Sequence, residues 1–205
     1  MPPPRSHRTL LLAVLLPQTA DRGRSGEAGG WPGVGPPATA DPRRHMVVLG
    51  LFVRADLENV TDFAAPGDHR WCLDVQESGS AEVKRGVFVS NEEEVEVPGG
   101  RGTAHVVLRF QKGGKACSIS VREVKGRTRP LTAEDAAPVA LVAFECRGCE
   151  LVGWTPTAGY RCRSTGGTAF EDVDLTEGEW ADYDEENDLS VMIENVESSF
   201  ETIKV

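Results

Sequence analysis

Two cysteines separated by two residues carry the clearest chemical potential in this sequence. Cys146 and Cys149 stand in the run FECRGCELVGW, and their spacing occurs both in metal sites and in redox-active pairs. A structural zinc ion needs four ligands, usually from two such pairs, whereas the other three cysteines stand alone at Cys72, Cys117 and Cys162. Five cysteines at irregular spacing also form no evident disulfide framework. We therefore expect a reduced protein whose cysteines are mostly small buried apolar groups.

A redox pair would need a thiol whose pKa is lowered, as happens at the positive N-terminal end of a helix. Cys146 instead follows a predicted strand, and no convincing helix comes after Cys149. The carboxylates of Glu145 and Glu150 should raise the thiol pKa values, and Arg147 opposes them only in part. A thiol oxidoreductase that uses Cys146 and Cys149 remains an alternative that we do not favour.

Other motifs for catalysis or ligand binding are missing from the sequence. The glycine-rich runs PGGRGT and KGGKA lack the spacing of a phosphate-binding loop and are predicted to be hairpin turns. No Gly-x-Ser-x-Gly elbow is present, and the four histidines lie in no recognisable motif. The ten carboxylates between Glu171 and Asp188 lack EF-hand spacing and are predicted to be solvated surface. We predict no catalytic residue and no enzymatic activity.

Charge divides the chain into two parts. Residues 1–45 contain six arginines and three acidic residues, a balance of +3, which leaves −13 on residues 46–205 out of a net charge of −10. An acidic body repels phosphate backbones, so we expect no nucleic acid as a partner. The apolar run Leu10–Leu16 is too short to span a bilayer. We expect residues 1–45 to be a disordered extension, either a non-native start or a weak targeting segment, on a cytoplasmic protein without membrane contact.

Short apolar or alternating runs, broken by Gly, Pro, Asp and Asn, predict a protein whose regular structure consists mainly of β-strands. Strands are expected at Met46–Val53, Arg70–Val75, Glu94–Val97, Ala104–Phe110, Cys117–Val124, Val139–Glu145 and Ser190–Val196. Alternation within residues 118–122 places one face inward and the other in water. A helix is suggested only at residues 132–135. Thr132 could cap its N-terminus, and the side chain of Asp135, three residues later, could accept the Thr132 backbone N–H in return.

Several stretches resemble the eukaryotic CXXC-motif-containing zinc-binding protein family, long known as a domain of unknown function. They are ADLENVTDF, HRWCL, GGRGTA, VAFECRG, TAGY, GTAFEDVDLTEGEWADYDE and SVMIENVESSFE. The likeness runs from Met46 to about Glu201. It implies one compact domain over residues 46–205, all-β and mainly antiparallel, with two similar halves and little helix.

The resemblance also implies a zinc ion held by two Cys-x-x-Cys pairs, and this chain departs from that pattern. The first pair falls on Glu77 and Ser80, and the second falls on Phe110 and Gly113. Phenylalanine and glycine offer no ligand, and one carboxylate cannot hold zinc with useful affinity. We therefore predict a degenerate zinc site, no metal-binding residues and no cofactor. The hairpins on the zinc side must then be held by packing, for example by Phe110 and Phe88.

The resemblance supplies no enzymatic activity. We expect a monomeric, non-catalytic soluble binding or scaffold protein whose protein partner is unidentified. An alternative is a zinc-binding protein that keeps one structural zinc through relocated cysteine ligands, with Cys72 and Cys117 near the lost pairs in sequence.

Overall fold

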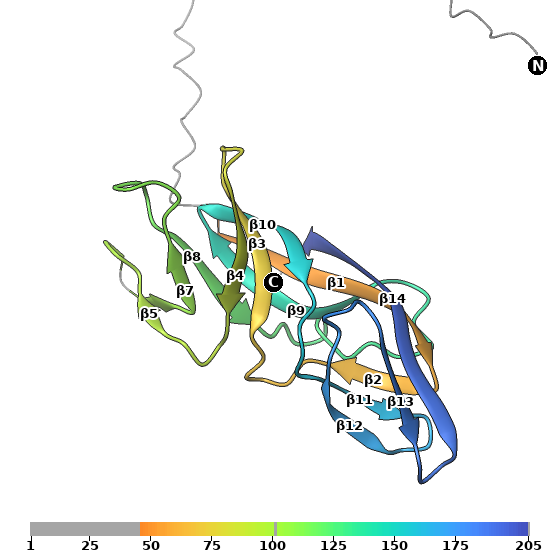
Figure 1. Cartoon of the computed structure of the whole chain (residues 1–205). Coiled ribbons are helices and arrows are strands. Elements are labelled where there is room, and N and C mark those ends of the chain that lie inside the picture. Colours follow the sequence, from red (N-terminus) through yellow and green to blue (C-terminus); the bar gives the residue numbers. More distant parts are fainter. Residues whose placement is uncertain (1–45, 101, 205) are drawn as a thin grey trace, which may run out of the picture. The chain divides into compact units, whose positions relative to one another are not determined.

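The computed structural model describes residues 46–100 and 102–204, in which all regular structure is β-strand (Figure 1). The strands are β1 (Met46–Glu58), β2 (Val60–Ala64), β3 (Trp71–Glu77), β4 (Val83–Val89), β5 (Val95–Glu96), β6 (Thr103–Ala104), β7 (Val106–Leu108), β8 (Cys117–Arg122), β9 (Val139–Arg147), β10 (Cys149–Thr155), β11 (Tyr160–Ser164), β12 (Ala169–Val173), β13 (Trp180–Asp184) and β14 (Leu189–Thr202). The described part holds no helix that could cross a membrane. The all-β prediction is confirmed, and the predicted extension 1–45 lies outside the described residues.

Six antiparallel strands form the largest sheet, in the order β13-β14-β1-β9-β8-β7. Its central pair, β1 and β9, extends from Met46 opposite Arg147 to Val53 opposite Val139, with a shift of register between Leu51 and Phe52. β1 is flanked on its other side by the long strand β14. Side chains on the inner face of β1, such as Leu51, are fully buried in the core. The apolar runs of the sequence thus mark the middle of this sheet.

Two sharp corners carry the chain out of the large sheet. β1 turns into β2 at Asn59, whose φ is 51°, and β9 turns into β10 at Gly148, whose φ is 74°. Asparagine and glycine are residue types that adopt this left-handed conformation readily. After the corners, β2 joins β11 and β12 in one small sheet, while β10 joins β3 and β4 in another. Strands that switch sheets in this way form the corners of packed β-structures.

The strand order shows two similar halves. The strands correspond in pairs: β1 with β9, β2 with β10, β3 with β11, β4 with β12, β7 with β13 and β8 with β14. Exchanging the members of each pair reproduces the order of the six-stranded sheet and converts each of the two small sheets into the other. Only the two-stranded hairpin of β5 and β6 has no counterpart among the described strands. The expected internal duplication is therefore present in the topology.

Aromatic side chains from several strands form the centre of the core. Phe63 and Tyr160 are fully buried, with ring centres 5.3 Å apart. Trp71 meets Phe144 edge-on at 5.8 Å, which connects the small sheet of β3 to the large sheet. His69 lies 4.3 Å from Tyr160 and is only 5% exposed. The motifs HRWCL and TAGY are thus brought together by packing.

Two local expectations were wrong in detail. Ser118 and Ser120 of β8 do not face water, because residues of the β5–β6 hairpin, including Ala104, help to cover them. Residues 132–135 form a turn rather than a helix: the Asp135 carboxylate accepts the backbone N–H and the hydroxyl of Thr132 at 2.9 and 2.8 Å. The bond from the Thr132 N–H to Asp135 forms as predicted, but the Asp135 N–H donates to the Thr132 carbonyl instead of its hydroxyl, and no apolar periodicity follows that would extend the turn into a helix.

Candidate functional site

The four positions at which the resemblance places zinc ligands lie in two hairpin turns. Glu77 and Ser80 belong to the turn between β3 and β4, while Phe110 and Gly113 belong to the turn between β7 and β8. Figure 1 draws both turns at its upper edge, on the side where β9 passes into β10. Lys84 of β4 reaches across, and its Nζ lies 5.8 Å from the centre of the Phe110 ring. The two hairpins therefore meet through side chains.

The first turn uses its polar groups internally. Ser80 Oγ accepts the Glu82 N–H at 3.1 Å, and the Ser80 N–H donates to the Glu77 carbonyl at 3.1 Å. The Gln76 side-chain amide donates to the Ser80 carbonyl at 2.7 Å. Ser80 thus closes a turn, and Glu77 is the one anionic side chain among the four positions.

The second turn offers no ligand atom on its side chains. Phe110 is only 8% exposed and packs into the main core, as predicted. Gly113 has a φ of 82° in a turn closed by the Gly114 N–H and the Gln111 carbonyl at 3.0 Å. The ammonium of Lys84 over the Phe110 ring is a favourable cation–π contact. The same positive charge would repel a divalent cation at this place.

Three cysteines converge beside these turns. Cys149 stands opposite Glu77 in the pairing of β10 with β3, and the Cys117 thiol donates to the Gly148 carbonyl at 3.0 Å. The thiols of Cys146 and Cys149 donate to the carbonyls of Phe144 and Ser118, both at 3.9 Å. The Cys149 thiol also interacts with the thiols of Cys117 and Cys146. None of the three cysteines is more than 3% exposed. The sequence pair is therefore one part of a buried thiol trio.

The thiol pKa values diverge because the thiols share hydrogen bonds. The bond to Cys149, together with burial, raises the pKa of Cys146 far above its ordinary value. Burial, followed by the nearness of Cys149 and Glu77, raises the pKa of Cys117 to about 11. The pKa of Cys149 is lowered, chiefly by the hydrogen bond from Cys146. As expected, Glu145 and Glu150 act to raise the pKa of Cys146, and Glu150 acts to raise that of Cys149, but for Cys149 the hydrogen bond from Cys146 outweighs this effect.

The remaining two cysteines stand apart from this trio. Cys72 lies within β3, and Cys162 lies in β11 of the other half, where burial raises its pKa to about 12. All five cysteines are free and buried. The expectation of small buried apolar groups is confirmed, and Cys72 joins no candidate site.

The side chains at the four family positions do not fit a zinc ion. They supply one carboxylate, one hydroxyl already used within its turn, a phenyl ring and a bare backbone. Zinc in proteins prefers thiolate and imidazole ligands in a tetrahedral set. In residues 46–100 and 102–204, no group of three or more His, Cys, Asp or Glu is arranged to hold a metal ion. The thiol trio is therefore not a metal site in this arrangement.

The corresponding turns of the other half are joined by a buried carboxylate. Asp184, at the end of β13, is 1% exposed and accepts the hydroxyls of Ser164 and Thr168 from the neighbouring β11–β12 hairpin. The Asn187 side-chain amide donates to Asp184 Oδ2 at 2.9 Å. Sequence reasoning placed Asp184 in a solvated acidic run and missed this role. The contact of Asp184 with Ser164 joins two different hairpins, so the sequence pattern around Asp184 does not show it.

The described histidines serve packing and backbone contacts. His105 lies at the bend between β6 and β7, inside the single strand predicted at Ala104–Phe110, and its Nδ1 accepts the Val121 N–H at 3.0 Å. His69 lies edge-on to Trp71 and against Tyr160 in the core. Neither position gives the arrangement of a nucleophile and its base.

Comparison with known proteins finds a matching family and several similar proteins. Residues 50–201 match the family described as CXXC motif containing zinc binding protein, eukaryotic. A protein of Nematostella vectensis named UPF0587 protein v1g245604 is 35% identical over 158 residues, which cover 76% of this chain and 98% of that protein. A Homo sapiens protein named CXXC motif containing zinc binding protein is 34% identical over 159 residues, with the same coverage.

Two solved structures share the fold. The crystal structure titled C1orf123 superposes with a TM-score of 0.69 at 32% identity and covers 76% of this chain and 99% of its own. A hypothetical protein from Plasmodium falciparum superposes with a TM-score of 0.70 at 26% identity, over 76% of this chain and all of that one.

Proposed function

Because the chain belongs to the eukaryotic family of CXXC motif containing zinc binding proteins, we propose that it is a member that works without zinc, as a non-catalytic binding protein. The observation that supports this is the contact between Lys84 and Phe110, in which a buried ring stands at a position where the resemblance calls for a thiolate and a cation lies over that ring. A metal ion that bridges two hairpins contributes directly to folding. Packing between the hairpins offers a substitute for that bridge.

A surface suited to a protein partner lies on the small sheet of β10, β3 and β4. The side chains of Val83, Phe88 and Val152 are 39%, 49% and 49% exposed, although they are large and apolar. β4 and β10 form the two edges of this sheet, so their backbones are open on one side in the described chain. Exposed apolar side chains on sheet edges favour contact with another protein. We expect a monomer in the cytoplasm that binds a protein through such contacts.

Metal analysis of the purified full chain tests the zinc-free proposal. We expect well below one zinc per chain, and unchanged thermal unfolding after treatment with a chelator. The positive control is the fourfold variant Glu77→Cys, Ser80→Cys, Phe110→Cys and Gly113→Cys, which restores the family ligands and should retain zinc. About one zinc per unmodified chain, with a melting temperature that falls on chelation, would refute the proposal.

Zinc held by relocated cysteines is the second candidate: three thiols lie near Glu77, although they would have to rearrange, because as they stand they form no metal-holding group. The variants Cys117→Ser and Cys149→Ser decide this case. If the unmodified chain contains zinc and either substitution removes it, the relocated site is correct. Cys162→Ser is the matched control, since Cys162 is buried in β11 of the other half, in a sheet that contains none of the trio.

Thiol oxidoreductase activity is tested by alkylation. The lowered pKa of Cys149 favours a reactive thiolate, whereas its burial to 3% exposure keeps reagents away. We expect burial to dominate, so that Cys149 reacts with iodoacetamide more slowly than a free thiol at neutral pH and normally only after unfolding. Rapid alkylation of Cys149 in the folded chain would revive the oxidoreductase hypothesis.

A further inference from the structure

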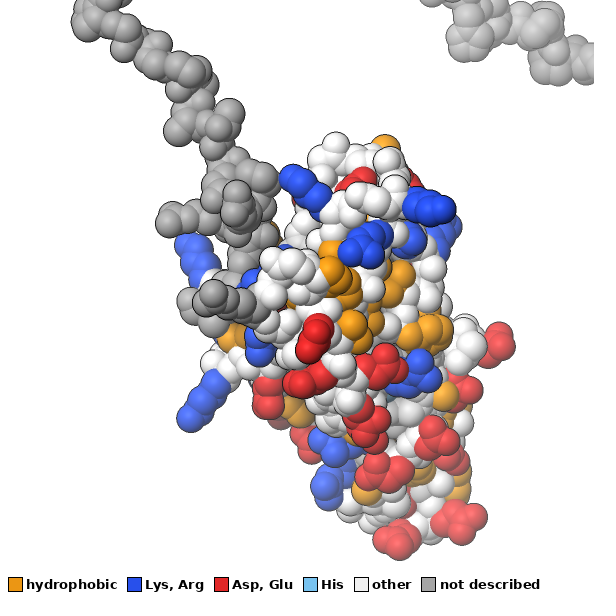
Figure 2. Space-filling model, turned by 90° about the vertical axis from the view of Figure 1, so that its left-hand side faces the viewer, with side chains coloured by type: hydrophobic (Ala, Val, Ile, Leu, Met, Phe, Trp, Pro, Cys, Tyr) orange, Lys and Arg blue, Asp and Glu red, His pale blue; other side chains and the backbone are white. Residues whose placement is uncertain are grey.

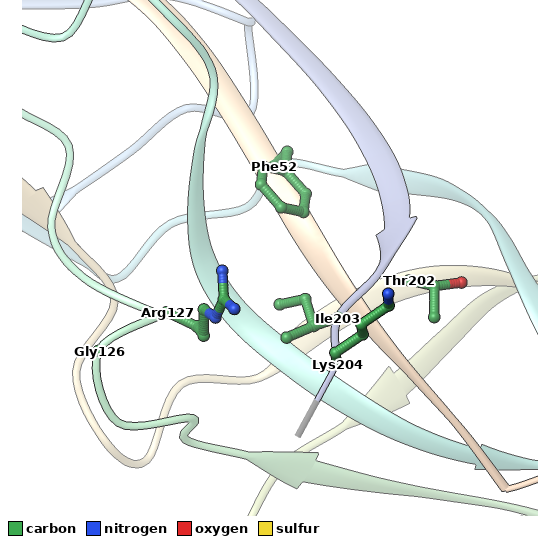
Figure 3. Close-up of a pocket in the computed structure, with 6 residues that line it drawn as sticks. All are labelled: Phe52, Gly126, Arg127, Thr202, Ile203 and Lys204. Carbon is green, nitrogen blue, oxygen red and sulfur yellow. The ribbon is translucent and has the colours of Figure 1, made fainter.

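A hollow of about 400 Å³ lies on the outer face of the large sheet, away from the hairpin turns. It is lined by Phe52 of β1, by Gly126 and Arg127 after β8, and by Thr202, Ile203 and Lys204 at the end of β14 and just beyond. Figure 3 shows Phe52 and Ile203 facing the same space, with Arg127 and Lys204 entering from different segments. The hollow therefore has an apolar floor and a rim with two cations.

A missing side chain on β1 allows the floor to form. A Cβ on Gly50 would lie 2.4 Å from Ile203 Cδ1, so glycine at position 50 leaves room for Ile203 to rest across β1 in this position. The Ile203 N–H donates to the Val48 carbonyl at 2.8 Å and fixes the segment that follows β14. Ile203 packs here with Ala140 and Ala143 of β9 in a small cluster separate from the main core. The floor is thus a built feature of the sheet.

Two cations, Arg127 and Lys204, stand on the rim of the hollow. Residues 46–205 carry −13, yet none of the described residues that line the hollow is acidic. Some described arginines form ion pairs with carboxylates, as Arg122 does with Glu145 and Arg129 with Asp135. Arg127 and Lys204 form no ion pair within the described part of the chain, which is also true of other surface cations. Two cations without carboxylates, beside an apolar floor, are complementary to a negatively charged group attached to an apolar body.

We propose that this hollow binds a free aliphatic carboxylic acid, with the chain on Phe52 and Ile203 and the carboxylate between Arg127 and Lys204. Its volume lies at the lower end of the range for small-molecule sites, about 300–1,000 Å³, which favours a small ligand over a protein loop. Carboxylates accept charge-assisted hydrogen bonds from both guanidinium and ammonium groups. This binding site is independent of the zinc question.

Titration of the full chain with decanoate, followed by calorimetry and by the NMR signals of the Ile203 methyl groups, tests the proposal. We expect saturable binding that weakens about tenfold in Arg127→Ala and again in Lys204→Ala, because each removes a charge-assisted bond. Gly50→Ala should also weaken binding, because it displaces Ile203 from the floor. Lys125→Ala is the matched control: this exposed neighbour of Gly126 does not line the hollow, and its loss should change affinity little.

Two further ligands separate the sources of binding. Decyltrimethylammonium keeps the apolar chain but reverses the charge, and it should bind much more weakly than decanoate. An acetylated tripeptide ending in leucine with a free carboxylate represents the C-terminus of a protein. The proposal is wrong if decanoate fails to bind, if the two cation variants bind it as well as the unmodified chain, or if only the peptide binds.

Discussion

At the scale of single residues, Asp184 shows how a buried charge can hold two turns together. Burial by itself would raise its pKa, but hydrogen bonds from Ser164, Asn187 and Thr168 outweigh this effect and lower the pKa to about 2. A buried carboxylate with all its acceptor sites used rigidifies its surroundings, whereas a partly satisfied one is costly. Asp184 therefore depends on its partners as much as they depend on it.

We predict that Asp184→Asn lowers the urea midpoint of unfolding, since the amide cannot accept all the donors that surround the carboxylate. The exposed neighbour Glu185 is the control, and Glu185→Gln should leave the midpoint nearly unchanged. Because the folded-state pKa is depressed, the stabilisation by Asp184 is complete above the ordinary value of 3.8 and is lost as the pH falls through about 2. An equal midpoint for both variants would contradict this role.

His69 gives the folded protein a second dependence on pH. Burial lowers its pKa from the ordinary value of 6.5, although the Gly159 backbone and Asp68 partly oppose the shift. The unfolded chain then binds the proton more readily than the folded one. The free energy of unfolding is therefore highest above about pH 6.5 and falls as the pH drops below that value.

We predict that His69→Phe flattens this slope between about pH 7.5 and pH 5.5, since it removes the group that gains a proton on unfolding. Urea unfolding at several pH values measures the effect. His105 also has a pKa lowered by burial, so some slope should remain in the variant. A slope unaltered by the substitution would show that His69 is already protonated in the folded chain.

At the scale of elements, the β3–β4 and β7–β8 hairpins illustrate two ways of joining turns. In one half a carboxylate network connects the paired hairpins, and in the other Phe110 and Lys84 make the connection. We also expected Phe88 to hold these hairpins. It is instead 49% exposed, with the Arg70 guanidinium 5.3 Å from its ring centre.

Phe110→Ala should destabilise the protein by about 3–5 kcal/mol, the usual cost of removing a buried ring. Phe88→Ala is the matched control, for which about 1 kcal/mol or less is expected because the ring is half exposed. Thermal or urea unfolding of both variants, with and without a chelator, measures the difference. If the two substitutions cost the same, Phe110 does not bridge the hairpins.

At the scale of the whole molecule, negative charge is the dominant feature of the described domain. Figure 2 shows acidic side chains gathered mainly over the lower part of one face, with basic side chains mainly over the upper part. The run from Glu171 to Asp188 contributes ten carboxylates to the total of −13. Repulsion among these charges opposes the compact state.

We predict that the free energy of unfolding rises, by at most about 1 kcal/mol, when sodium chloride is raised from about 10 mM to about 0.2 M, because salt screens the repulsion. Urea unfolding at constant pH measures this change. Variants in which a surface lysine or arginine is replaced by alanine should show a steeper rise of unfolding free energy with salt than the unmodified chain, because their net charge is more negative. Stability that decreases with salt would mean that attractive ion pairs outweigh the repulsion.

The sequence by itself determined the class of fold, because period-two alternation and turn residues at Pro98–Gly102 or Gln111–Lys115 are local signals. It predicted the strands of the large sheet best, since β1 and β9 have continuous apolar runs and β8 alternates. The strands β2, β4, β10, β11, β12 and β13 were missed. Five of them lie at sheet edges, where polar side chains are tolerated, whereas β11 is central in its sheet but carries two arginines among its five residues. The resemblance to the family located the four ligand positions, and the residues that stand there supply no thiolate.

Only the tertiary structure decided which of these residues meet. Lys84 over Phe110, the thiol trio around Cys149 and the burial of Asp184 all join segments from different hairpins. The basic hollow likewise depends on Gly50 and Ile203, which are separated by most of the domain. Such contacts depend on how the sheets pack, and packing is a property of the whole chain that local pattern and spacing do not encode.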